Sequence, residues 1–116
     1  MKGILAGLAL AAPTAALGAP VIYLDCQLPS PEGPRVARLA MDEDHKEVIY
    51  QLPSEKMTKR LPAAFTPSNV TFAVPDGGGE ITFSVNRLSL SVERYRRIGI
   101  EKSPTSRGTC SATTAP

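Results

Sequence analysis

Three arginines and one tyrosine follow one another near the carboxyl end of the chain. Guanidinium groups bind phosphate and carboxylate oxygens through paired hydrogen bonds, and an aromatic ring among them adds a stacking surface. A run of this kind is suited to an anion such as a lipid headgroup, an envelope polymer or a nucleic acid. The alternative, which we favour, is a solvated strand end whose charges protect a sheet edge from aggregation. The run consists of Arg94, Tyr95, Arg96 and Arg97.

The only histidine of the chain, His45, lies in an acidic run. A catalytic base or a metal centre would need partner residues at a suitable spacing, and the sequence around His45 offers none. The acidic run also lacks the spaced ligands and the central glycine of an EF-hand loop. We therefore expect a surface turn here, and the sequence predicts no catalytic residue, no metal ligand and no cofactor. The acidic neighbours are Asp42, Glu43, Asp44 and Glu47.

The chain has two cysteines, Cys26 and Cys110. In an oxidising compartment two thiols form one disulfide without ambiguity, whereas in a reducing cell both would stay free. Closing a loop of about 85 residues would stabilise the fold by roughly 4 to 5 kcal/mol in the chain-entropy model. Neither cysteine belongs to a C-x-x-C motif, so nothing indicates redox catalysis or a zinc site. We predict a disulfide between Cys26 and Cys110.

The amino terminus has the pattern of a secretory signal peptide. Lys2 precedes an apolar stretch over residues 4–12, as in the charged and hydrophobic regions of such a signal. Small side chains at Ala16 and Gly18 suit signal peptidase, which needs small residues one and three positions before the cleaved bond. We therefore predict a signal peptide over residues 1–18 and a mature chain that begins at Ala19.

Two other interpretations of this leader are possible. Residues 3–24 carry no charge and approach the length of a bilayer span, but Pro13 and Pro20 interrupt them. A lipoprotein signal would need a small residue before its cysteine, and Asp25 precedes Cys26. We favour a cleaved signal, with no stable membrane span afterwards and a periplasmic or secreted location.

Composition limits the fold and the partners. At 116 residues the chain suits one domain, and its 11 prolines favour short strands over long helices. Thirteen Lys and Arg against 11 Asp and Glu leave a net charge of +2, too small to indicate a nucleic-acid partner by bulk electrostatics. We expect a single β domain over residues 19–110 and a flexible tail over residues 111–116.

The clearest structural pattern is a predicted hairpin. Apolar residues alternate with polar ones on both sides of a glycine-rich turn at residues 76–79, as in antiparallel strands with one buried face. After Asn86 the alternation changes phase, which indicates a bulge or, as we prefer, a two-residue turn at Asn86-Arg87 that pairs Val85 with Leu88. The alternating apolar residues are Val70, Phe72, Val74, Ile81, Phe83 and Val85.

Shorter patterns predict the remaining elements. Strands are expected at residues 21–24, 35–41 and 47–52, with a final short strand around residues 98–100. A turn of helix is expected within residues 53–60. Together these segments predict an all-β fold of about six or seven short strands, arranged as an antiparallel sheet, a small barrel or a sandwich.

Three segments resemble a loosely defined group of small periplasmic proteins of Gram-negative bacteria. Members of that group have an early cysteine, a strand ending in Ile/Val-x-Arg and a late Gly-x-Cys. The resemblance implies a periplasmic location and a disulfide, and it implies no activity. Residues 88–90 depart from the pattern, since many members have a glycine shortly after the arginine. The matching segments are residues 65–72, residues 81–87 and Gly108-Thr109-Cys110.

The function expected from these patterns is that of a non-enzymatic exported domain that binds a partner or has a structural role. The alternative is an inhibitor of an exported hydrolase that acts through a loop, at residues 29–34 or 53–62. An enzyme is disfavoured because no pair of nucleophile and base is recognisable. The partner could be an exported protein or an anionic envelope polymer.

Overall fold

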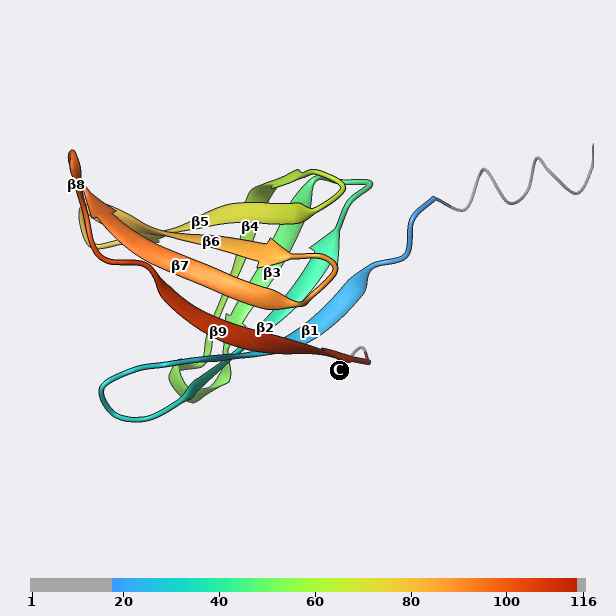
Figure 1. The fold of residues 1–116 in the computed structure, drawn as a ribbon. Helices are drawn as coiled ribbons and strands as arrows, with labels where there is room; N and C mark the ends of the chain where they lie inside the picture. The colour runs from blue at the N-terminus through green and yellow to red at the C-terminus, as the bar shows by residue number, and fades with distance from the viewer. Residues whose placement is uncertain (1–17, 115–116) are drawn as a thin grey trace, which may run out of the picture.

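The computed structural model describes residues 18–114, so the predicted signal peptide lies almost wholly outside the described residues. The described chain forms nine strands and one short 3₁₀ helix, with no α-helix among them (Figure 1). The all-β prediction is therefore confirmed, although the strands are more numerous than expected. The elements are β1 (Ile22–Leu28), β2 (Arg35–Asp42), β3 (Glu47–Leu52), η1 (Pro53–Glu55), β4 (Met57–Phe65), β5 (Asn69–Asp76), β6 (Gly79–Asn86), β7 (Ser91–Ile98), β8 (Glu101–Lys102) and β9 (Ser106–Thr113).

The strands form a closed antiparallel barrel. From β1 to β7 each strand pairs with the next one along the chain, β7 also pairs with β9, and β9 pairs with β1. Eight strands therefore close the barrel, and the ninth, β8, pairs with β7 alone. In Figure 1, β8 lies at the far tip of the β7 hairpin, away from the β1–β9 seam.

Alternate side chains of each strand point into the barrel and form its core. In β6, for example, Phe83 and Val85 are buried while the residues between and beside them are partly exposed. Three aromatic rings pack together at the centre: Phe72 and Phe83 stack at 5.1 Å, and Tyr50 lies 5.4 Å from Phe83. The predicted hairpin over residues 70–85 is thus confirmed as β5 and β6, with its apolar face inside the barrel.

The seam between β1 and β9 joins the two ends of the described chain. Cys26 and Cys110 lie directly opposite each other in this pairing and form a disulfide that links residues 84 positions apart. Gly108 allows the close approach of β9, because a Cβ atom there would lie 2.2 Å from the carbonyl oxygen of Gln27. The predicted disulfide is confirmed, and the glycine of the Gly-x-Cys motif has a packing role beside it.

The helical turn expected within residues 53–60 is shorter than predicted. Only Pro53–Glu55 form a 3₁₀ turn, and β4 begins at Met57. Pro62 is compatible with this strand because its neighbour Ala63 donates a backbone hydrogen bond to Lys46, 3.0 Å away. The nitrogen of the preceding residue, Pro62, therefore points away from β3 and toward β5. At this position β4 and β5 are not paired, so no backbone hydrogen bond is needed there.

The predicted two-residue turn at Asn86-Arg87 is wrong. Residues 87–90 form the connection, because the Asn86 side chain accepts hydrogen bonds from the backbone of Leu88 and Ser89, both at 2.9 Å. Leu90 then adopts a positive φ of 62°. Val85 pairs with Val92 rather than with Leu88, whose residue surface is 85% exposed.

The carboxyl-terminal strand was not expected from the sequence. Residues 106–113 form β9, so ordered pairing continues three residues past Cys110 into the segment for which a flexible tail was predicted. The expected final strand around residues 98–100 is also displaced: Ile98 ends β7, and Ile100 is fully exposed in the turn to β8. Small polar residues gave no alternation in β9, and its conformation depends on the strands on either side.

Replacing both cysteines with serine, C26S/C110S, should lower the free energy of unfolding by about 2 to 5 kcal/mol, because the unfolded chain loses its cross-link. Urea denaturation followed by circular dichroism measures the change. Wild-type protein unfolded under reducing conditions should behave like the double variant. Equal stability of the oxidised wild type and the variant would contradict a disulfide that closes the barrel.

Candidate binding site at the open end of the barrel

The two ends of the barrel differ in structure. One end carries the turns at residues 43–46, 66–68 and 87–90, and we call it the closed end. The opposite end carries the connection at residues 29–34, the η1 turn and the β7–β8–β9 extension, and we call it the open end. Antiparallel pairing of consecutive strands places these connections alternately at the two ends.

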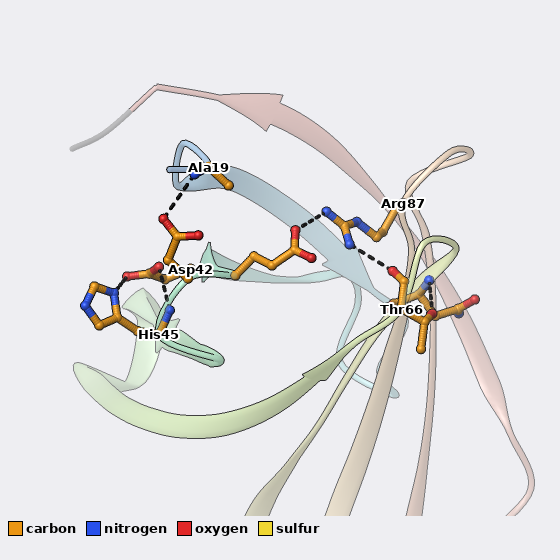
Figure 2. A network of polar contacts seen from close by, with 8 residues as sticks. Ala19, Asp42, His45, Thr66 and Arg87 are labelled. Carbon is orange, nitrogen blue, oxygen red and sulfur yellow. Dashed lines mark hydrogen bonds and ion pairs between the residues drawn. The ribbon is translucent and has the colours of Figure 1, made fainter. Parts of the chain in front are cut away.

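A network of polar contacts covers the closed end (Figure 2). Arg87 forms an ion pair with Glu43 at 2.7 Å and donates a hydrogen bond to the carbonyl of Thr66 at 2.8 Å. The guanidinium carbon of Arg87 also lies 5.7 Å from the centre of the Phe65 ring. The hydrogen bond from Arg87 lowers the pKa of Glu43 below its usual value. These contacts tie three turns together across this end of the barrel.

The acidic run belongs to the same end and has local partners. His45 Nδ1 lies 2.8 Å from Asp42 Oδ2, and the Asp44 carboxylate accepts a hydrogen bond from the backbone nitrogen of Ala19 at 3.0 Å (Figure 2). Desolvation opposes ionisation of Asp42, but hydrogen bonds from His45 outweigh it, so the pKa of Asp42 is lowered. The His45 side chain is 74% exposed, on the predicted surface turn. Within residues 18–114 no cluster of three potential metal ligands is found.

The open end arises where two neighbouring strands separate. β4 pairs with β3 from Met57 to Pro62, but it pairs with β5 only from Ala63 to Phe65. Figure 1 shows β4 and β5 diverging from that point. A cavity of about 300 Å³ lies between the two halves of the wall. Its apolar lining consists of Leu28, Leu52, Met57, Val74, Pro75 and Ile81.

Tyr50 is a polar residue among those that line this cavity. Its ring belongs to the aromatic core and only 4% of the residue is exposed, yet Tyr50 also lines the cavity. Burial raises the pKa of its hydroxyl, and the positive charges of Arg94 and Arg35 act in the opposite direction. The phenol is therefore protonated at neutral pH and can donate a hydrogen bond.

Two arginines from opposite walls line the same cavity. Arg94 points toward the barrel interior, because residues directly opposite each other in an antiparallel pair lie on the same face and Arg94 is opposite the buried Phe83. On its other side β7 pairs with β9, where Arg94 is opposite Ser106. Its guanidinium donates to the Pro29 carbonyl at 2.8 Å and to the Ser106 hydroxyl at 3.2 Å. Arg35 begins β2 and forms an ion pair with Glu55 of η1.

The structure divides the predicted cluster of arginines between two faces of β7. Arg94 and Arg96 lie in the inward register, and Arg96 forms an ion pair with Asp76 at 2.8 Å. Tyr95 and Arg97 lie on the outer face, where the Lys102 ammonium is 4.1 Å from the Tyr95 ring centre. The four residues therefore do not form one patch, and anion binding by them stays a prediction.

Arg35 and Tyr50 were not predicted from the sequence as members of a site. Tyr50 alternates with Val48 and Leu52 in β3, so its inward position could have been predicted. The position of Arg35 opposite Arg94 depends on barrel closure, which no local pattern encodes.

A larger hollow of about 650 Å³ lies on the outer surface of β1–β4 around Ala40. Four of its five charged side chains pair with one another, Asp25 with Arg38 at 3.2 Å and Glu47 with Arg60, and the fifth, Asp42, contacts His45. The charges of each pair compensate each other, although Asp25 Oδ1 is buried and has no hydrogen-bond partner among the described residues.

Comparisons with protein-family models, curated proteins and solved structures find no match to this chain. The resemblance to small periplasmic proteins therefore stays a prediction. Within residues 18–114, no helix has the length and apolar character needed to cross a membrane.

Replacing Glu43 with glutamine should lower the melting temperature at neutral pH, because Arg87 loses its charged partner. The Glu43 pKa is depressed in the folded protein, so the stabilisation is complete above the ordinary value of 4.5 and is lost as the pH falls through the folded value. The difference between wild type and Glu43→Gln should therefore shrink in acid. Melting curves across pH measure it, with Glu93→Gln at the exposed Glu93–Arg107 pair as the control. A difference that does not change with pH would contradict this account.

Proposed function

We propose that the protein is an exported, non-enzymatic binding domain that takes its ligand at the open end of the barrel. One observation carries the proposal: the cavity at the open end combines apolar walls with Arg94, which has no carboxylate partner among the described ion pairs, whereas the smaller cavity of about 230 Å³ at the closed end has its one arginine, Arg87, paired with Glu43. Small-molecule sites commonly combine an apolar lining with a few polar groups that orient the ligand. His45 lies at the closed end and contacts Asp42, so it does not contribute to this cavity.

Export is supported by the disulfide and by the contact at Ala19. Disulfides persist mainly in oxidising compartments such as the periplasm or the cell exterior. Ala19 is the predicted first residue of the mature chain, and its nitrogen lies 3.0 Å from Asp44 Oδ2. Cleavage after Gly18 would convert this amide nitrogen into an ammonium group, so the hydrogen bond would become an ion pair.

The exported protein should begin at Ala19, which amino-terminal sequencing of the periplasmic or secreted fraction determines. In that form Asp44→Asn should destabilise the fold by at most about 1 kcal/mol, as expected for an exposed ion pair. In a form with one extra residue before Ala19, the nitrogen of Ala19 is an uncharged amide, and this form should respond less to the same substitution. A chain that still starts at Met1 in the membrane fraction would contradict the proposal of export by cleavage.

Inhibition of an exported hydrolase is a second candidate, favoured by the arrangement of two connections at the open end. Arg35 links the end of the 29–34 loop to Glu55 of η1, and Arg94 binds the carbonyl of Pro29. Loops held in this way are pre-organised, which lowers the entropic cost of binding a partner. The other loop predicted for this role, at residues 53–62, is shorter in the structure, because residues 57–62 belong to β4 and only residues 53–56 form the connection.

A cavity-filling substitution tests the proposed binding role. Ile81→Trp places an indole in the cavity, and Thr82→Trp places the same group on the outer face of β6. Small molecules and proteins that co-purify with the exported wild type should also co-purify with Thr82→Trp and be lost with Ile81→Trp. Met57→Trp, on the opposite wall, serves as a second blocking variant if Ile81→Trp does not fold.

Each outcome of this comparison bears on the proposal. Recovery of nothing specific with the wild type, or identical recovery with the blocked variants, would contradict binding at the open end. If a hydrolase is among the lost proteins, its activity should fall on addition of a stoichiometric amount of wild type, which would favour the inhibitor.

A further inference from the structure

We infer that the open-end cavity binds a small organic carboxylate with an apolar body, through Arg94, Arg35 and Tyr50. This inference rests on the proposed binding role of the open end and specifies its ligand. The three residues come from three different strands, β7, β2 and β3, and all of them line the cavity.

The charge balance of the cavity favours a monoanion. Arg35 and Arg94 line it directly, and Arg96, an exposed residue outside the lining, adds a third positive charge through its ion pair with Asp76. Glu55 and Asp76 supply two negative charges among the same lining residues. One positive charge is therefore left without a counterpart in this group, which matches a carboxylate better than a doubly charged phosphate.

Arg94 is held in place while most of its donors remain available. A guanidinium group has five N–H donors, and Arg94 directs one at the Pro29 carbonyl and one at the Ser106 hydroxyl. These two bonds fix the group, so little side-chain entropy would be lost when a carboxylate binds. Its remaining donors and the Tyr50 hydroxyl can together satisfy the lone pairs of one carboxylate.

The apolar lining indicates what the carboxylate is attached to. Leu52 and Met57 line the cavity from β3 and β4, and Val74 and Ile81 line it from β5 and β6. An apolar body bound there would transfer its surface from water to these side chains. The cavity volume of about 300 Å³ lies at the small end of the range for ligand pockets. A short aliphatic or single-ring acid fits this space, and inorganic phosphate would leave the apolar walls unused.

Binding of sodium octanoate to the mature, oxidised chain tests the inference, with octanol and inorganic phosphate as comparison ligands. Titration calorimetry should detect saturable binding of octanoate, and both comparison ligands should bind at least tenfold more weakly. In ¹H–¹⁵N spectra, octanoate should shift signals of Tyr50, Ile81 and Arg94 and leave those of the closed end unchanged.

Arg94→Gln should weaken octanoate binding by about tenfold or more, because it removes a charged hydrogen-bond donor. Arg97→Gln is the matched control, since Arg97 lies on the outer face of the same strand and should change the affinity less than twofold. Tyr50→Phe keeps the ring and removes only the hydroxyl, and it should weaken binding several-fold.

Absence of saturable octanoate binding, or equal binding by Arg94→Gln and wild type, would overturn the inference. If octanoate does not bind, but a molecule that co-purifies with the wild type is absent from Ile81→Trp, the proposed binding role stands and the ligand class is wrong. If octanoate does not bind and the same molecules co-purify with Ile81→Trp as with the wild type, both the inference and the proposed function are wrong. Phosphate binding at least as tight as that of octanoate would contradict an apolar acid.

Discussion

The pairing of β1 with β9 is the constraint on which the other features depend. Strands β1 to β7 can pair with their neighbours through short connections alone, but barrel closure requires the two ends of the described chain to meet. The Cys26–Cys110 disulfide fixes that meeting at one register, and Gly108 lets the backbones approach. Closure then determines which side chains point inward, because successive residues of a strand face opposite sides.

That alternation places two arginines where a barrel interior is usually apolar. A charged group is costly to bury without partners, so such residues are tolerated only where solvent or polar atoms reach them. Arg94 and Arg35 lie at the open end, where β4 and β5 have separated, and both are only partly buried. At the closed end Arg87 is matched by Glu43, and at the open end Arg35 is likewise matched by Glu55, whereas Arg94 bonds only to the Pro29 carbonyl and the Ser106 hydroxyl among the described residues. The difference between the ends is therefore one of charge compensation as well as shape.

Much of the fold could be predicted from local patterns, and much of the candidate site could not. The β5–β6 hairpin alternates strictly between apolar and polar residues, and the two cysteines allowed only one pairing. Strand β4 could not be predicted, because charged residues and a proline interrupt its apolar pattern at Lys59, Arg60 and Pro62. The small residues of β9 gave no strand pattern either, because barrel closure positions that strand. Continuing the alternation from Val92 would have placed Arg94 inward, but Arg35, which lines the same cavity, comes from a strand more than 50 positions away.

A crystal structure of the oxidised mature protein soaked in sodium bromide tests the central claim most directly, since bromide is a small monoanion located by its anomalous scattering. The account predicts Arg94 inside the open end and a bromide ion within hydrogen-bond distance of Arg94 and Tyr50. An Arg94 side chain on the outer surface, or a barrel wall in which β4 and β5 pair along their whole length and leave no cavity, would contradict it.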